Sequence, residues 1–171
     1  MPIIGWLAAG VFQGAFTFFM AWEGMTGQGF GMFSVPLLYL AALLSTVMLL
    51  GSYPMTQVYQ HEEDGRRCYE TISRKLGVLG TFFFTAAMFT LASAGFASYY
   101  QYYYSLQYAL LFFVVLSPVL GYFFNWFVLV YRDARKANFK RTMRLYRITS
   151  ICLSAFFVLF WVLQQWGIRL L

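Results

Sequence analysis

The sequence predicts an all-α protein, a polytopic bundle of transmembrane helices, and three features of its composition point to this class. Hydrophobic residues make up 61% of the 171 residues and charged residues only 11%, whereas roughly 25% of the residues in average soluble chains are charged. The mean hydropathy is +0.63. Phe, Tyr and Trp together reach 22%, an excess that suits lipid-facing and interfacial positions. We therefore expect an integral membrane protein of the cell (inner) membrane.

Five hydrophobic runs are long enough to cross a bilayer, because about 20 apolar residues in a helix span its hydrocarbon core. A helix also satisfies its own backbone polar groups, which lipid cannot do. We expect a single transmembrane domain over residues 1–171, with these five spans: 3–22, 35–58, 78–97, 107–131 and 149–167.

The first span, 3–22, has no basic segment before its apolar run, so we do not expect a cleaved signal peptide. In the second span, 35–58, Pro54 lacks a backbone N–H and predicts a kink. If this helix continues to residue 64, a polar stripe about 60° wide follows, and its members are Tyr53, Gln57, Gln60 and Asp64. Such stripes face a bundle interior or a wet cavity, so we expect the first two members to line one with Asn125. The alternative is a solvated helix end, whose carboxylates are balanced by nearby arginines.

The third and fifth spans, 78–97 and 149–167, each begin where a basic segment ends. The fourth span, 107–131, carries small or polar residues at near-helical spacing, which are Ser117, Pro118, Gly121 and Asn125. Small residues in a membrane helix usually allow close packing. The amide of Asn125 needs a polar partner, because a bare amide in hydrocarbon is costly.

The basic residues predict the orientation of the chain. Residues 59–77 carry four Lys and Arg and residues 132–148 carry seven, whereas the loops after the first and third spans carry none. By the positive-inside rule, the two basic loops are cytoplasmic. The N-terminus is then cytoplasmic and the C-terminus outside, as an odd number of spans requires. The net charge of +6 is thus explained by topology, and we expect no nucleic-acid partner.

The loop 59–77 holds four of the six acidic residues and the only histidine, His61. One histidine cannot supply the paired motifs of a di-iron site, and no nucleophile signature accompanies it. A phosphate-binding glycine loop is also missing from the sequence. What remains is a group of carboxylates and amides beside basic residues at a membrane surface. Mg²⁺ prefers one or two carboxylates plus substrate phosphates, so the pattern suits a diphosphate carried by a lipid-soluble chain.

The stretch YQHEEDGRRCYETISRKLG, residues 59–77, resembles the second aspartate-rich motif of the UbiA-type intramembrane prenyltransferases. In that family a span ends in D-x-x-x-D, and a cytoplasmic loop of the form x-x-x-G-x-x-T-L-x-x-x-L-G leads into the next helix. Gln60 and Asp64 take the two aspartate positions, and Cys68 stands where the loop glycine is usual. The later positions are matched by Thr71 with Ile72 and by Leu76 with Gly77.

The resemblance implies a fold and a reaction. Family members have nine spans, so the five spans of this chain correspond to the C-terminal part, spans five to nine. Two aspartate-rich motifs of the family face each other over a central cavity, where Mg²⁺ is held on the diphosphate of an isoprenoid donor. The implied function is transfer of an isoprenyl group from its diphosphate to a lipid-soluble acceptor, which we expect to be aromatic. The implied partners are this donor and acceptor, membrane lipids, and a missing N-terminal half or partner chain.

The resemblance also assigns residues. Asp64 is expected to be the principal Mg²⁺ ligand, helped by Glu63 and Gln60. The basic residues expected to contact the diphosphate are Arg66, Arg67, Arg74 and Lys75.

The first aspartate-rich motif is not present in the 171 residues, and Gln60 and Tyr69 replace acids that are common in the second. Three explanations stay open: a fragment, a split half that pairs with another chain, or a member that has lost the chemistry. The alternative function is that of a non-catalytic small integral membrane protein that binds a lipid or a partner subunit.

The predicted topology is tested with single cysteines placed at Gly65 and at Gln101 in a cysteine-free background. Because the loop 59–77 is expected to be cytoplasmic and the loop near Gln101 outside, an impermeant thiol reagent should label intact cells only at position 101. Labelling at position 65 but not at position 101 would reverse the topology.

Overall fold

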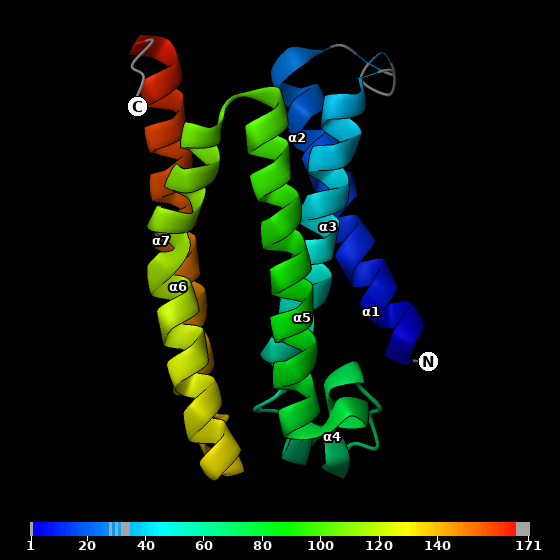
Figure 1. Cartoon of the computed structure of the whole chain (residues 1–171). Coiled ribbons are helices and arrows are strands. Elements are labelled where there is room, and N and C mark those ends of the chain that lie inside the picture. The colour runs from blue at the N-terminus through cyan, green and yellow to red at the C-terminus, as the bar shows by residue number, and fades with distance from the viewer. Residues whose placement is uncertain (1, 28, 30, 32–34, 167–171) are drawn as a thin grey trace. The chain divides into compact units, whose positions relative to one another are not determined.

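The computed structural model describes residues 2–27, 29, 31 and 35–166, and every regular element in this part of the chain is helical (Figure 1). Five helices are long and apolar enough to cross a membrane, and their bounds are Pro2–Thr26, Pro36–Gln57, Ile72–Tyr103, Leu106–Arg132 and Phe139–Trp166. The prediction of an all-α protein with five candidate membrane spans is therefore confirmed. The expected end of the fifth span, residue 167, lies outside the described residues, as does Arg169.

The chain folds as two compact units, Met1–Phe96 and Ala97–Leu171. The first span of the first unit consists of three consecutive helical segments, α1 (Pro2–Val11), a π-helical turn (Phe12–Phe16) and α2 (Thr17–Thr26). This span ends at Gly27, which has a φ of 62° and donates its N–H to the carbonyl of Glu23. Glycine takes this left-handed conformation without steric cost and commonly closes helices in this way.

The π-helical turn lies against the second span at Thr46. A Cβ at Gly14, in the centre of the turn, would approach the Cα of Thr46 to 2.6 Å. The hydroxyl of Thr46 accepts a 3.0 Å hydrogen bond from the backbone N–H of Ala15 and donates to the carbonyl of Ala42 at 3.0 Å. The regular hydrogen-bond ladder is interrupted in a π turn. The hydroxyl of Thr46 therefore bonds to a backbone amide of the first span at a point where the two helices approach closely.

Helix α3 (Pro36–Gln57) begins at a proline, whose fixed φ suits the first helical position, and continues through Pro54. The missing N–H of Pro54 leaves the carbonyl of Leu50, four residues earlier, without its helical donor. The indole N–H of Trp6 in α1 donates to this carbonyl at 2.9 Å. The first and second spans are therefore joined by a polar contact that Pro54 makes necessary.

Helix α5 (Ile72–Tyr103) has one non-helical residue, Gly77, with a φ of 69° and a ψ of 173°. The long regular part of the helix thus starts at residue 78, where the third span was expected. The hydroxyl of Thr85 in α5 donates a buried 2.9 Å hydrogen bond to the carbonyl of Gly51 in α3. Gly51 also allows close approach of the two helices, because a Cβ there would lie 2.6 Å from the Cβ of Met88.

The second unit contains α6 (Leu106–Arg132) and α7 (Phe139–Trp166), which run antiparallel along each other (Figure 1). Its core includes Phe123 and Trp126 of α6 and Phe156 of α7, all at most 2% exposed. A short 3₁₀ turn, Ala134–Lys136, lies in the connection. The last turns of α5 belong to this unit, and the Tyr100 ring lies with its centroid 5.1 Å from that of Phe156.

Candidate functional site

The segment that links the second and third spans forms a short helix, α4 (His61–Arg66), and not an extension of α3. Helix α3 ends at Gln57, and the N–H of Gln60 bonds to the Gln57 carbonyl at 2.9 Å, three residues back. The polar stripe that needed a continuous helix to Asp64 was therefore a wrong prediction. The side chain of Gln60 is exposed and donates to the hydroxyl of Tyr59 at 3.2 Å.

The physical reason for this break is a polar contact with α5. The Nε2 of His61 lies 2.7 Å from the hydroxyl of Ser73, which lies 3.0 Å from the hydroxyl of Thr81. Ser73 and Thr81 have no exposed surface, and Thr81 also donates to the carbonyl of Gly77 at 2.8 Å. A buried hydroxyl pair needs partners. His61 is one of these partners. Because α3 ends at Gln57 and the separate helix α4 follows, His61 lies close enough to bond to Ser73.

Burial lowers the pKa of His61 below its ordinary value of 6.5. The carboxylate of Asp64 opposes this shift, and the guanidinium of Arg74 adds to it. His61 is therefore neutral at pH 7. The arrangement joins a histidine to a serine hydroxyl, but Ser73 is fully buried. The described geometry suits a structural link between α4 and α5 and does not suit an exposed nucleophile.

Arg74 holds the loop between α4 and α5 closed. Its Nη1 donates to the carbonyl of Tyr69 at 2.5 Å and to that of Asp64 at 3.3 Å. The side chain of Asp64 accepts a long, 3.4 Å hydrogen bond from the hydroxyl of Thr71. Arg74 was expected to contact a diphosphate, but its Nη1 donates hydrogen bonds to the backbone of its own loop.

The three expected metal ligands do not converge. Glu63 forms an exposed ion pair with Arg67, with 2.7 Å between the carboxylate Oε1 and Nη2, and Gln60 points to Tyr59. Asp64 is half-buried beside Thr71. Within the described residues, no group of three or more His, Cys, Asp or Glu side chains lies close enough together to hold a metal ion.

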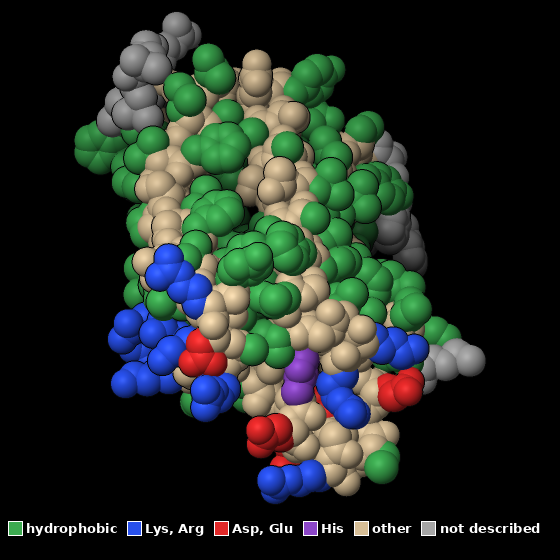
Figure 2. Space-filling model, turned by 60° about the horizontal axis from the view of Figure 1, so that its bottom comes forward, with side chains coloured by type: hydrophobic (Ala, Val, Ile, Leu, Met, Phe, Trp, Pro, Cys, Tyr) green, Lys and Arg blue, Asp and Glu red, His purple; other side chains and the backbone are tan. Residues whose placement is uncertain are grey.

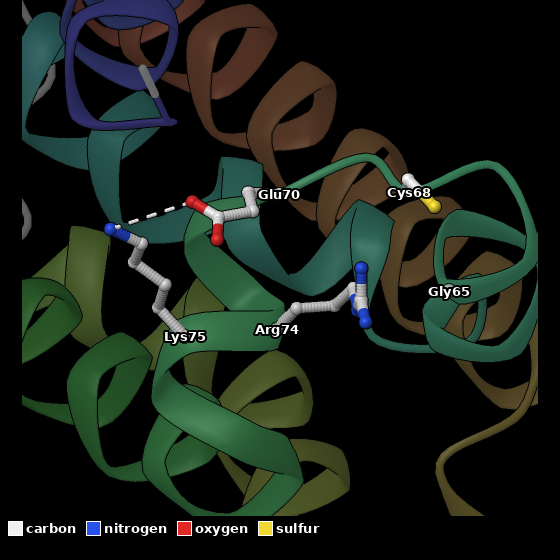
Figure 3. Close-up of a pocket in the computed structure, with 5 residues that line it drawn as sticks. All are labelled: Gly65, Cys68, Glu70, Arg74 and Lys75. Carbon is white, nitrogen blue, oxygen red and sulfur yellow. Dashed lines mark ion pairs between the residues drawn. The ribbon is translucent and has the colours of Figure 1, made fainter.

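Two of the four expected diphosphate contacts line a hollow of about 370 Å³ at the start of α5, and its lining residues are Gly65, Cys68, Glu70, Arg74 and Lys75. In Figure 3, Arg74 extends towards the turn that holds Gly65, while Glu70 and Lys75 face each other. The Nζ of Lys75 lies 3.8 Å from the Oε2 of Glu70, with both side chains at least half exposed. Such a pair contributes little to stability, so it does not hold Lys75 firmly.

The backbone of the loop has positive φ at two positions, Cys68 with 56° and Gly77 with 69°. Glycine adopts such angles freely, whereas for a residue with a Cβ the conformation costs about 1 kcal/mol or more of free energy. Cys68 is thus held in an unfavourable conformation. Its N–H bonds to the carbonyl of Gly65 at 3.2 Å, and the N–H of Tyr69 bonds to that of Asp64 at 2.8 Å.

The residues expected to line a cavity lie in both units. Tyr53 and Gln57 are half-buried near the end of α3, and the Oε1 of Gln57 is buried without a hydrogen-bond partner among the described residues. Asn125 belongs to α6 in the second unit, where its side chain is exposed. None of the three lines the hollow beside α4.

Sequence reasoning did not select three residues that shape this region, namely Ser73, Thr81 and Glu70. The spacing of Ser73 and Thr81, eight residues apart on either side of Gly77, is a weak signal, because hydroxyls are frequent in membrane helices. Glu70 was visible as the only acid within five residues of Lys75. Only the fold shows that it borders the hollow.

Comparison of the chain with protein-family models, with curated proteins and with solved structures found no match. The site and the composition therefore define a class, a helical membrane protein with five candidate spans, and nothing more specific.

His61 provides a pH test of the contact between α4 and α5. Because its folded pKa lies below 6.5, the unfolded loop binds a proton first as the pH falls. The stability that the contact contributes is thus complete above about pH 6.5 and is lost as the pH falls through the lowered folded value. As the only histidine, it gives one imidazole Cε1–H NMR signal, whose pKa should lie below 6.5 and should fall further in Asp64→Asn, because the Asp64 carboxylate raises it. A wild-type midpoint at or above 6.5 would contradict the buried contact.

Proposed function

We propose that this chain is the C-terminal portion of a UbiA-like prenyltransferase. One observation carries the proposal: the loop 59–77 has positive φ at Cys68 and at Gly77, the two positions where the resembling motif has glycine. A motif conserves glycine at a position mainly where the backbone needs such an angle. The agreement at Cys68 is independent of residue type, because this chain has no glycine there, whereas Gly77 is itself one of the matched residues.

The reaction proposed for the whole enzyme is transfer of an isoprenyl group to a lipid-soluble acceptor. The bond between the first isoprenyl carbon and the diphosphate oxygen breaks, and its electron pair leaves with the diphosphate. The acceptor forms the new bond to that carbon and releases a proton to solvent. Mg²⁺ would stabilise the charge that develops on the leaving diphosphate.

The loop fits a Mg²⁺ ion that arrives with the diphosphate better than it fits an all-protein metal site. Mg²⁺ is commonly bound by one or two carboxylates together with substrate phosphates. Asp64 is half-buried and forms no ion pair within the described residues, so it is the carboxylate we assign to the metal. Glu63 would first have to leave Arg67, and Gln60 contributes a carbonyl without charge.

Among the basic residues, Lys75 and Arg66 are the best candidates for the diphosphate. Lys75 lines the hollow and forms only an exposed 3.8 Å pair with Glu70. Arg66 is exposed and has no ion pair among the described residues. Arg74 has a positioning role in this proposal, because it binds the carbonyls of Asp64 and Tyr69.

A second candidate, a non-catalytic membrane protein that binds a lipid or a partner subunit, is favoured by one specific observation. Much of the charge in the loop is satisfied internally, by the pairs Glu63–Arg67 and Glu70–Lys75. A loop whose charges are paired in this way needs no ligand, and connecting two spans is then a sufficient role for it. Both candidates agree on the fold and differ in whether Asp64 binds a metal.

Substitution of Asp64 distinguishes the candidates. If Asp64 holds the metal, Mg²⁺ should promote binding of a farnesyl diphosphate analogue, and Asp64→Asn should remove about 2–4 kcal/mol of that Mg²⁺-dependent part. The amide keeps the shape of the side chain but loses the charge. Calorimetric titration of the full chain in detergent, with and without Mg²⁺, measures the effect.

Glu62→Gln is the matched control, because Glu62 is an exposed carboxylate in the same short helix. A change of at most about 0.5 kcal/mol is expected there, as at ordinary surface positions. Equal and Mg²⁺-independent affinities for wild type, Asp64→Asn and Glu62→Gln would refute the metal site and favour the non-catalytic candidate.

A further inference from the structure

We propose that the turn between α6 and α7 is a binding site for the phosphate groups of anionic phospholipids in the cytoplasmic leaflet. The first argument is the distribution of charge between the two basic loops. Residues 59–77 carry four Lys and Arg against four acids, a net charge of zero, whereas residues 132–147 carry seven against one, a net charge of +6. The positive-inside rule explains basic residues in both loops. Only in residues 132–147 is the positive charge not balanced by acidic residues.

Most cations of the turn form no ion pair among the residues that the structure describes. The single acid, Asp133, pairs with Arg135 at 3.3 Å. Within the described residues, no ion pair involves the remaining six cations, which are Arg132, Lys136, Lys140, Arg141, Arg144 and Arg147. On the left of Figure 2, Lys and Arg side chains accordingly gather around one acidic side chain. A cluster of cations with so few carboxylates attracts anions.

The turn is an ordered scaffold. The indole N–H of Trp126 donates to the carbonyl of Lys136 at 2.9 Å, and the hydroxyl of Tyr122 donates to that of Arg141 at 3.1 Å. The side chain of Asn138 accepts from the N–H of Arg141 at 3.1 Å and so caps the start of α7. Two aromatic residues of α6 thus fix the backbone that carries the cations, which lowers the entropic cost of binding.

The face of α7 on which three cations lie indicates a lipid and not a soluble partner. Lys140, Arg144 and Arg147 are exposed and share a sector about 60° wide at helical spacing. The same face continues into the membrane span with Ile151 and Val158, which are 62% and 60% exposed. The charges therefore lie directly above side chains that face acyl chains.

The length of α7 places these charges at headgroup level. Its 28 residues extend about 42 Å at 1.5 Å per residue, close to the roughly 40–45 Å of a bilayer with its headgroups. Lys140 to Arg147 occupy the first turns after its start at Phe139. Clusters of four to eight basic residues at such a position are typical of anionic-lipid recognition.

The test compares lipid binding to the full chain in neutral detergent by native mass spectrometry, with dioleoyl phosphatidylglycerol and dioleoyl phosphatidylcholine as probes. Wild type should bind phosphatidylglycerol at least tenfold more tightly than phosphatidylcholine. The variant Lys140→Gln/Arg144→Gln/Arg147→Gln should lose at least tenfold of that affinity, because each headgroup cation contributes about fivefold. The charge-conserving variant Lys140→Arg/Arg144→Lys/Arg147→Lys should retain it, which separates lost charge from lost folding.

Arg144→Gln alone should lose about fivefold, and its matched control is Arg67→Gln, which removes a cation of the other basic loop that Glu63 already pairs. The affinity of Arg67→Gln for phosphatidylglycerol should stay within about twofold of wild type. Equal affinity of wild type for the two lipids, or an equal loss in the control variant, would overturn the proposal. If inorganic phosphate displaces phosphatidylglycerol more strongly than chloride at matched ionic strength, the site binds a small anion and the lipid assignment is wrong.

Discussion

The first unit depends on one constraint, which is that a proline in a membrane helix frees a carbonyl that lipid cannot satisfy. Pro54 does this to the carbonyl of Leu50, and the indole of Trp6 supplies the missing donor. The next carbonyl, that of Gly51, accepts from Thr85. Two hydrogen bonds in one turn of α3 thus attach the first and third candidate spans to the second, where apolar contacts alone would leave their register poorly defined.

This attachment positions the loop that follows. Helix α3 ends at Gln57, one turn after Pro54, and α5 is held at Thr85, one turn beyond Thr81. The start of α5 is therefore fixed relative to the end of α3. The link from His61 through Ser73 to Thr81 can form only because both ends are in place, and Arg74 then closes the segment between them. The loop carries charge, but its shape is set by uncharged hydroxyls and carbonyls.

The spans were predictable because hydrophobicity is a local property of the sequence, and the regular part of α5 starts after Gly77, at the residue where the third span was expected. The path of the chain after Gln57 was not predictable. Helical periodicity assumes a continuous helix, and the break depends on a contact between His61 and Ser73, twelve residues apart. The partnership of Trp6 with the Leu50 carbonyl joins residues 44 positions apart. Sequence reasoning identified Pro54 as a disturbance but had no means to find the donor that compensates for it.

The most direct test of this account is a double-mutant cycle between Trp6 and Pro54, measured by reversible unfolding in mixed micelles. Trp6→Phe keeps an aromatic ring and removes the N–H donor. In the wild-type background it should cost about 1 kcal/mol, because a half-buried carbonyl loses its partner. In a Pro54→Ala background the restored backbone N–H satisfies the Leu50 carbonyl, so the same substitution should cost close to zero. A coupling energy near 1 kcal/mol is predicted. Equal costs in the two backgrounds would show that the Trp6 hydrogen bond does not compensate for Pro54, which contradicts the account.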